Sequence, residues 1–81
     1  MDIIKLNIVS PESTLVDTEV ESVTLPGTMG PFQVLKDHAP LISSLEKGEI
    51  VYVEGGRTQT LPISSGFVEV LSNTVSACVE I

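Results

Sequence analysis

The chain has 81 residues, with eleven acidic side chains against four basic ones and a formal charge of −7 at pH 7. That length allows a single domain, residues 1–81, and the negative charge argues against nucleic acid or anionic lipid as a partner. No apolar stretch approaches the roughly 20 residues that cross a bilayer, and the N-terminus lacks the pattern of a secretory leader. We therefore expect a soluble protein without membrane insertion, and its one cysteine, Cys78, excludes an internal disulfide.

The kinds of apolar residue favour strands over helices. Val, Ile and Thr supply 25 of the 81 residues, whereas Ala occurs only twice. Side chains branched at Cβ pack well on a pleated surface, and Ala is the best helix former. The composition therefore predicts an all-β domain.

Alternating apolar residues predict short strands in the first half of the chain. Ile4, Leu6 and Ile8 share one face of a first strand, which ends at Ser10-Pro11. A brief strand is predicted at 15–17 and another at 20–25. Two glycines and two prolines then form a sharp loop at 26–31 that needs positive φ, and an extended run follows at 32–35.

The segment 36–47 is the least strand-like part of the sequence. Leu45 lies three residues after Ile42 and four after Leu41, as on one face of a helix, but Pro40 and the serines are poor helix formers. We expect one turn of helix or an irregular crossover there.

The last third of the chain has the pattern of a β-meander. Gly55-Gly56 predicts a hairpin, and Pro62 in the returning strand suggests an edge or a bulge. A turn at 64–66 leads into a strand at 67–71, and the final strand at 74–80 places Val75, Ala77 and Val79 on one face. The whole pattern predicts a flattened β-sandwich or barrel of about ten short strands.

Candidate catalytic residues are few. His38 beside Asp37, five residues before Ser43, could act as a general base, but a hydrogen-bonded loop histidine is the better interpretation because no second catalytic group is specified. The glycine-rich loop lacks the lysine of a phosphate loop, and the scattered His, Cys and carboxylates lack metal-ligand spacing. We interpret Cys78 as a small packed residue. We therefore expect no catalytic residues, metal or cofactor, and a role in binding or structure.

One loop does suggest a contact. Met29 and Phe32 place two large apolar side chains beside a rigid turn. Contact with another molecule and capping of the core are both open interpretations.

The central segment resembles the N-terminal domain of the ε subunit of F-type ATP synthase. The resemblance rests on Leu25-Pro26-Gly27, Gly30, Val34-Leu35, the block His38-Ala39-Pro40-Leu41-Ile42, and Leu45 with Gly48. The opening 6–12 and the run Ser65-Gly66-Phe67-Val68-Glu69-Val70 extend it over the whole chain.

The sequence departs from the family pattern at three places. Gln33 stands where the family usually has glycine, and Lys36-Asp37 replaces the usual Pro-Gly, so the loop before His38 is expected to be less tightly turned. The family commonly continues into a hairpin of two inhibitory helices, whereas this sequence stops at Ile81. We expect a short form without the hairpin, either natural or truncated.

The resemblance implies a non-catalytic rotor subunit at the foot of the central stalk. It would bind the γ subunit and the polar loops of the c-ring, and help to couple ion flow to ATP synthesis. Its location would be peripheral, on the cytoplasmic face of the bacterial inner membrane. By motif position, Thr28, Met29, Gly30, Pro31 and Phe32 would face the c-ring, and the γ-facing positions would be Ser10, His38, Ala39, Pro40, Leu41 and Ser43.

The alternative is a carrier module of the lipoyl or biotinyl kind, which is also small, acidic and all-β. Such modules need a lysine at a hairpin tip, flanked by Asp and Ala or by Met. Here the lysines precede Leu6, Asp37 and Gly48, and the Gly55-Gly56 tip has none. The sequence therefore favours the rotor subunit.

Overall fold

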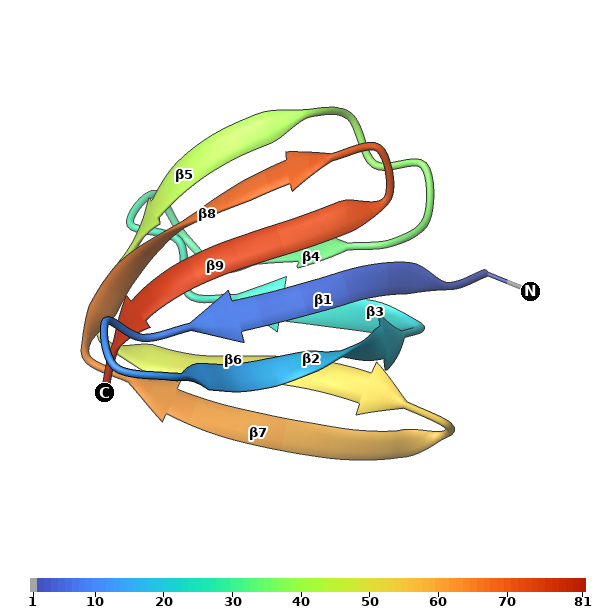
Figure 1. The fold of residues 1–81 in the computed structure, drawn as a ribbon. Helices are drawn as coiled ribbons and strands as arrows, with labels where there is room; N and C mark the ends of the chain where they lie inside the picture. The colour runs from blue at the N-terminus through green and yellow to red at the C-terminus, as the bar shows by residue number, and fades with distance from the viewer. Residues whose placement is uncertain (1) are drawn as a thin grey trace.

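A computed structural model describes residues 2–81 as two facing β-sheets with no helix among those residues (Figure 1). The described residues thus contain no helix with the length and hydropathy needed to cross a membrane. The strands are β1 (Ile4–Val9), β2 (Thr14–Val20), β3 (Ser22–Leu25), β4 (Phe32–Val34), β5 (Leu41–Leu45), β6 (Gly48–Glu54), β7 (Arg57–Ile63), β8 (Ser65–Leu71) and β9 (Thr74–Glu80).

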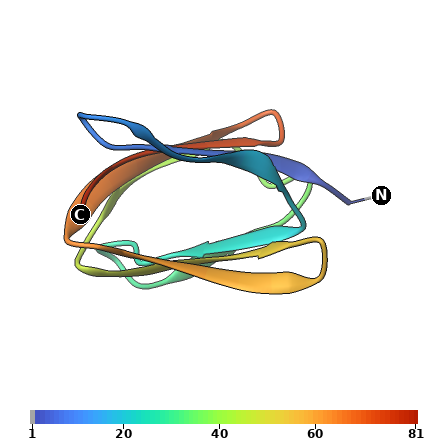
Figure 2. The ribbon, with the colours of Figure 1, turned by 60° about the horizontal axis from the view of Figure 1, so that its bottom comes forward.

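The strands form a sandwich, as the sequence predicts. One sheet has five strands in the order β2-β1-β9-β8-β5, and the other has four in the order β4-β3-β6-β7. Figure 2 shows the two layers stacked, with the chain crossing between them at both ends. All strand pairs are antiparallel except β1 and β9, which run parallel in the middle of the five-stranded sheet. The prediction of an all-β sandwich is confirmed, with nine strands in the described residues.

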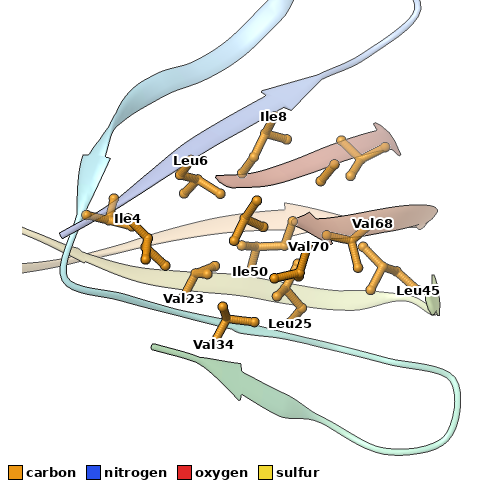
Figure 3. Close-up of a cluster of buried hydrophobic side chains, with 14 of the residues drawn as sticks. Ile4, Leu6, Ile8, Val23, Leu25, Val34, Leu45, Ile50, Val68 and Val70 are labelled. Atoms are coloured by element: carbon orange, nitrogen blue, oxygen red, sulfur yellow. The ribbon is translucent and has the colours of Figure 1, made fainter. Parts of the chain in front are cut away.

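The core lies between the sheets and is built by alternation along each strand. Side chains at every second position point inward, and Figure 3 shows them meeting in one layer. Among residues 2–81 no polar or charged residue is buried. The core side chains are Ile4, Leu6, Ile8, Val20, Val23, Leu25, Val34, Leu45, Ile50, Ile63, Val68, Val70, Val75, Ala77 and Val79.

The expectation of a helical turn or crossover at 36–47 is wrong, because residues 41–45 form β5. The spacing of Leu41 and Leu45 fits a strand as well as a helix, since residues four apart share a face in both. Leu45 is buried, and β5 pairs with β8 over its whole length. Ser43 and Ser44 are weak helix formers, so their propensity does not oppose an extended backbone.

Two strand boundaries also differ from the predicted ones. The second strand runs without a break from Thr14 to Val20, and the chain changes sheets at Glu21, whose N–H donates to the carbonyl of Val53 at 2.8 Å. The predicted turn at 64–66 is shorter, because β8 begins at Ser65.

The hairpin and edge predictions are confirmed. Gly55 and Gly56, with φ of 57° and 78°, join β6 to β7 as the two-residue turn requires. Pro62 lies in β7, an edge strand of the four-stranded sheet, where its missing N–H breaks no inner ladder.

Candidate interaction surface

The loop between β3 and β4 closes on itself and on β5. The N–H of Gly30 donates to the carbonyl of Gly27 at 2.9 Å, and Gly30 has the predicted positive φ, at 122°. The N–H of Thr28 donates to the carbonyl of Ser44 at 3.1 Å, and the two hydroxyl oxygens are 2.8 Å apart. These bonds fix the predicted c-ring-facing residues against the edge of the five-stranded sheet.

Met29 and Phe32 have different environments. Met29 is 97% exposed, whereas Phe32 is half-buried and packs against the core. A Cβ added at Gly27 would lie 2.9 Å from the Phe32 ring, so glycine is needed there for the ring to fit. Each interpretation of this loop therefore applies to one residue. Phe32 caps the core, and Met29 is the exposed apolar side chain that is available for contact with another molecule.

Ser10 closes the turn between β1 and β2. Its N–H donates to the carbonyl of Ser13 at 2.8 Å, and its hydroxyl oxygen accepts from the N–H of Ser13 at 3.2 Å. Ser10 therefore shapes the turn with its own hydroxyl group.

His38 follows a tight turn, so the expectation of a looser loop is wrong. The N–H of His38 donates to the carbonyl of Leu35 at 3.2 Å, and Asp37 takes the left-handed φ of 67° in place of the family's glycine. Asn73, in the β8–β9 turn, accepts from the N–H of Asp37 at 2.6 Å and donates to its carboxylate at 3.3 Å. The Asp37 carboxylate is thus bonded to Asn73, while His38 Nδ1 lies 2.7 Å from the carbonyl oxygen of Ala39. This geometry gives no support to a His-Asp catalytic pair.

The other predicted γ-facing residues lie along or just before β5. Ala39 and Pro40 are exposed, Leu41 packs against the core, and Ser43 is half-buried on the same side of the strand as Leu41. The residue that β5 turns outward between them is Ile42, which is 77% exposed.

Ile42, Phe67 and Leu71 form a group of exposed apolar side chains, named here the apolar band. This group was not identified from the sequence. Phe67 and Leu71 are 57% and 52% exposed and share the outward face of β8, next to β5. The other exposed large apolar residues, Met29, Leu35 and Ile81, lie outside the strands, so within residues 2–81 the four-stranded sheet contributes none. The alternation of Phe67, Glu69 and Leu71 with buried Val68 and Val70 is the sequence signal that could have revealed the band.

Cys78 extends this surface, contrary to its interpretation as a packed residue. It is exposed, because β9 buries Val75, Ala77 and Val79 and turns the intervening residues outward. In register it lies between Phe67 on β8 and Val9 on β1.

The apolar band joins the two groups of predicted γ-facing residues. A groove of about 540 Å³ runs from Ser10 and Pro11 past Cys78 to Phe67. A smaller groove of about 340 Å³ runs from Pro40 past Ile42 to Leu71. Ser10 and the His38 segment thus lie at opposite ends of one sheet, with the apolar band between them.

A two-layer sandwich whose exposed apolar strand residues gather on one outer face has the character of an interaction module. The chain belongs to the family described as the ATP synthase, delta/epsilon chain, β-sandwich domain, whose profile matches residues 3–81. The ATP synthase epsilon chain of Desulfitobacterium hafniense is 46% identical over 71 residues, which cover 88% of this chain and 54% of that one. The epsilon chain of Carboxydothermus hydrogenoformans is 42% identical over 74 residues, covering 91% and 55%.

A solved structure shares the fold. A chain in the cryo-EM structure of the Euglena gracilis mitochondrial ATP synthase, OSCP/F1/c-ring, superposes with a TM-score of 0.87 at 25% identity, covering 94% of this chain and 49% of that one. The present chain therefore spans about half the length of the relatives that it matches. No feature of the structure favours the carrier alternative: the β6–β7 tip is Gly55-Gly56, without a lysine.

Proposed function

We propose that the chain is the β-sandwich part of a non-catalytic ATP synthase rotor subunit. It links the γ subunit to the c-ring and helps to couple ion translocation to ATP synthesis. The observation that carries the proposal is the apolar band, which leaves one outer face of the sandwich suited to a permanent partner. The bacterial relatives support a peripheral location on the cytoplasmic face of the inner membrane, within the ATP synthase complex.

The γ subunit is the proposed partner of the five-stranded sheet. Its contact would extend from Ser10 across the apolar band to His38, Ala39 and Pro40, with Leu41 and Ser43 supporting Ile42 from the inner side of β5. Large apolar side chains exposed on neighbouring strands give such an interface its centre, and the turns at either end give it a polar rim.

The c-ring is the proposed partner of the loop Thr28, Met29, Gly30, Pro31 and Phe32. Met29 is the exposed contact residue, and Gly30, Pro31 and the bonds to Ser44 hold the loop in one conformation. A rigid loop loses little conformational entropy on docking, which favours a contact with short polar loops of the ring.

Co-purification with γ from the same organism tests the proposal. We expect a stoichiometric complex, and we expect Ile42→Asp to weaken it at least about tenfold because the carboxylate enters the apolar contact. Thr60→Asp is the matched control, since Thr60 is an exposed edge-strand residue on the other sheet. The absence of a complex with the unaltered chain, or equal loss in both variants, would contradict the proposal.

A further inference from the structure

Glu69 occupies the middle of the apolar band. It projects outward from β8, with Phe67 and Leu71 two residues to either side on the same face. Across the strands it lies opposite Ile42 on β5 and Ser76 on β9. A carboxylate therefore stands at the point where the proposed interface would be most completely covered.

The five-stranded sheet offers Glu69 no basic partner of its own. Lys5 is the single basic residue in its described strands, and in register it lies opposite Glu19 on β2 and Thr74 on β9. Lys5 and Glu69 are separated by the whole of β9, and strands lie about 4.8 Å apart, so their backbones are about 10 Å or more from each other. The remaining charged residues directed outward on this sheet are the carboxylates Asp17, Glu19 and Glu80.

Covering this face with a purely apolar surface would be unfavourable. A carboxylate removed from water loses its hydration, and the loss is offset only by a close cation or by several hydrogen bonds. Ser76 provides a single hydroxyl group beside Glu69. The surface that covers Ile42, Phe67 and Leu71 must therefore bring a cation, or several hydrogen-bond donors, to their centre.

We propose that Glu69 is a specificity-determining residue that pairs with a lysine or arginine of γ at the centre of an otherwise apolar contact. This inference rests on the proposed function, since it names the chemistry by which γ would be recognised. Glu80 lies near the Phe67 end of the band, and Asp17 and Glu19 lie on β2 at the far edge of the same sheet, so the rest of this face is mainly negative and matches a basic surface. An apolar surface without a cation at that point would be rejected, because it would leave Glu69 covered and unpaired.

A charge-swap experiment tests the pairing. The equilibrium constant for binding γ would be measured for the unaltered chain, Glu69→Gln, Glu69→Lys and the control Glu49→Gln. Glu49 is an exposed strand carboxylate on the outer face of the four-stranded sheet, opposite Pro62. We expect Glu69→Gln to weaken binding about thirtyfold or more, Glu69→Lys to weaken it further, and Glu49→Gln to leave it unchanged.

Rescue identifies the partner residue. Each lysine and arginine on the surface of γ would be changed singly to glutamate and paired with Glu69→Lys. We expect one such variant to restore binding at least tenfold relative to Glu69→Lys with unaltered γ. Glu69 and Glu49 are both exposed in the chain alone. Glu69→Gln, Glu69→Lys and Glu49→Gln should therefore unfold at the same urea concentration as the unaltered chain.

Different outcomes overturn different claims. If unaltered γ does not bind, the proposed function fails. If γ binds and Glu69→Gln binds as tightly or more tightly, Glu69 remains hydrated or unpaired in the complex, and the pairing is wrong while the proposed function stands. Failure of every γ variant to rescue Glu69→Lys would likewise overturn the pairing.

Discussion

Tyr52 shows how a residue's surroundings set its chemistry in this sandwich. It packs against the core from β6, and burial raises the pKa of its phenol, with the nearby Glu54 carboxylate raising it further. Both effects disfavour the phenolate. The carboxylate of Glu54 also accepts a hydrogen bond from Thr18 at 2.6 Å, which ties it to β2.

The sole tyrosine makes this pKa measurable by absorbance, because the chain has no tryptophan. We expect the phenolate signal to appear above pH 10 in the folded protein and near pH 10 in urea. The unfolded state then loses its proton first, so the stabilisation holds below pH 10 and is lost as pH rises through the folded pKa. Glu54→Gln should lower the folded midpoint yet keep it above the urea value. A folded midpoint at or below the urea value would contradict this account.

Gly66 illustrates a close approach of two strands. A Cβ at this position would lie 2.5 Å from the carbonyl oxygen of Cys78 and 3.0 Å from Cα of Val79, both backbone atoms of β9. We expect Gly66→Ala to lower the free energy of unfolding by about 3 kcal/mol, because the β8–β9 ladder must shift. Gly55→Ala, at a hairpin tip with open space, should cost about 1 kcal/mol for its φ of 57° alone. Urea unfolding measures both, and equal losses would show that backbone crowding at Gly66 has no effect.

At the scale of elements, strands with unbroken alternation of apolar residues could be predicted from the sequence. The strand at 41–45 could not, because the spacing of its apolar residues fits both a helix and a strand. The strand of Ile4, Leu6 and Ile8 and the Gly55-Gly56 hairpin follow from local pattern and turn chemistry. The strand of Leu41 and Leu45 does not, because only its pairing with β8 selects strand over helix. The apolar band could not be predicted for the same reason, which is its dependence on long-range pairing. Its members come from β5 and β8, and the sequence does not reveal the register between these two strands.

The β4–β5 and β8–β9 connections are joined by the Asp37–Asn73 pair. Asn73 also has a left-handed φ, 60°, and its carbonyl accepts from the N–H of Lys5 at 2.9 Å. Asn73→Gly keeps the backbone conformation and removes the amide, so we expect a loss of about 1 kcal/mol in unfolding free energy and faster hydrogen exchange at the Asp37 N–H.

Asp37→Gly is the informative counterpart of Asn73→Gly. Glycine relieves the left-handed φ of 67° and keeps the N–H that donates to Asn73. It loses the longer bond of 3.3 Å from the Asn73 amide to the carboxylate, so stability should be unchanged or higher by up to about 1 kcal/mol. Unchanged exchange at residue 37 in Asn73→Gly would show that the pair does not hold the loop.

At the scale of the whole molecule, the sandwich has two unlike outer faces. The five-stranded face presents the apolar band, and the four-stranded face presents residues such as Thr24, Val51 and Thr60. The chain has 4834 Å² of accessible surface, so an obligate interface of about 1,000 Å² per partner would cover about a fifth of it. If that interface lies on the five-stranded face, the β3–β4 loop remains accessible for the proposed contact with the c-ring.

The proposed separation of the γ contact from the c-ring contact can be tested at the β3–β4 loop. We expect Met29→Asp to leave the unfolding free energy within about 0.5 kcal/mol of the unaltered chain, because the side chain is 97% exposed. It should weaken docking to isolated c-rings and leave γ binding intact. Phe32→Asp should instead destabilise the fold by about 3 kcal/mol, since Phe32 packs against the core. Urea unfolding and c-ring pull-down separate the two effects, and a destabilised Met29→Asp would contradict the assignment.

The parallel pairing of β1 with β9 has a mechanical consequence. The first and last strands lie side by side, joined from Lys5–Thr74 to Val9–Cys78. A force pulling the two ends of the chain apart would slide these strands along each other, so their hydrogen bonds would share the load and break together. An antiparallel hairpin pulled at its open end would instead release them one at a time. The five-stranded sheet would thus resist tension between the ends along its stiffest direction.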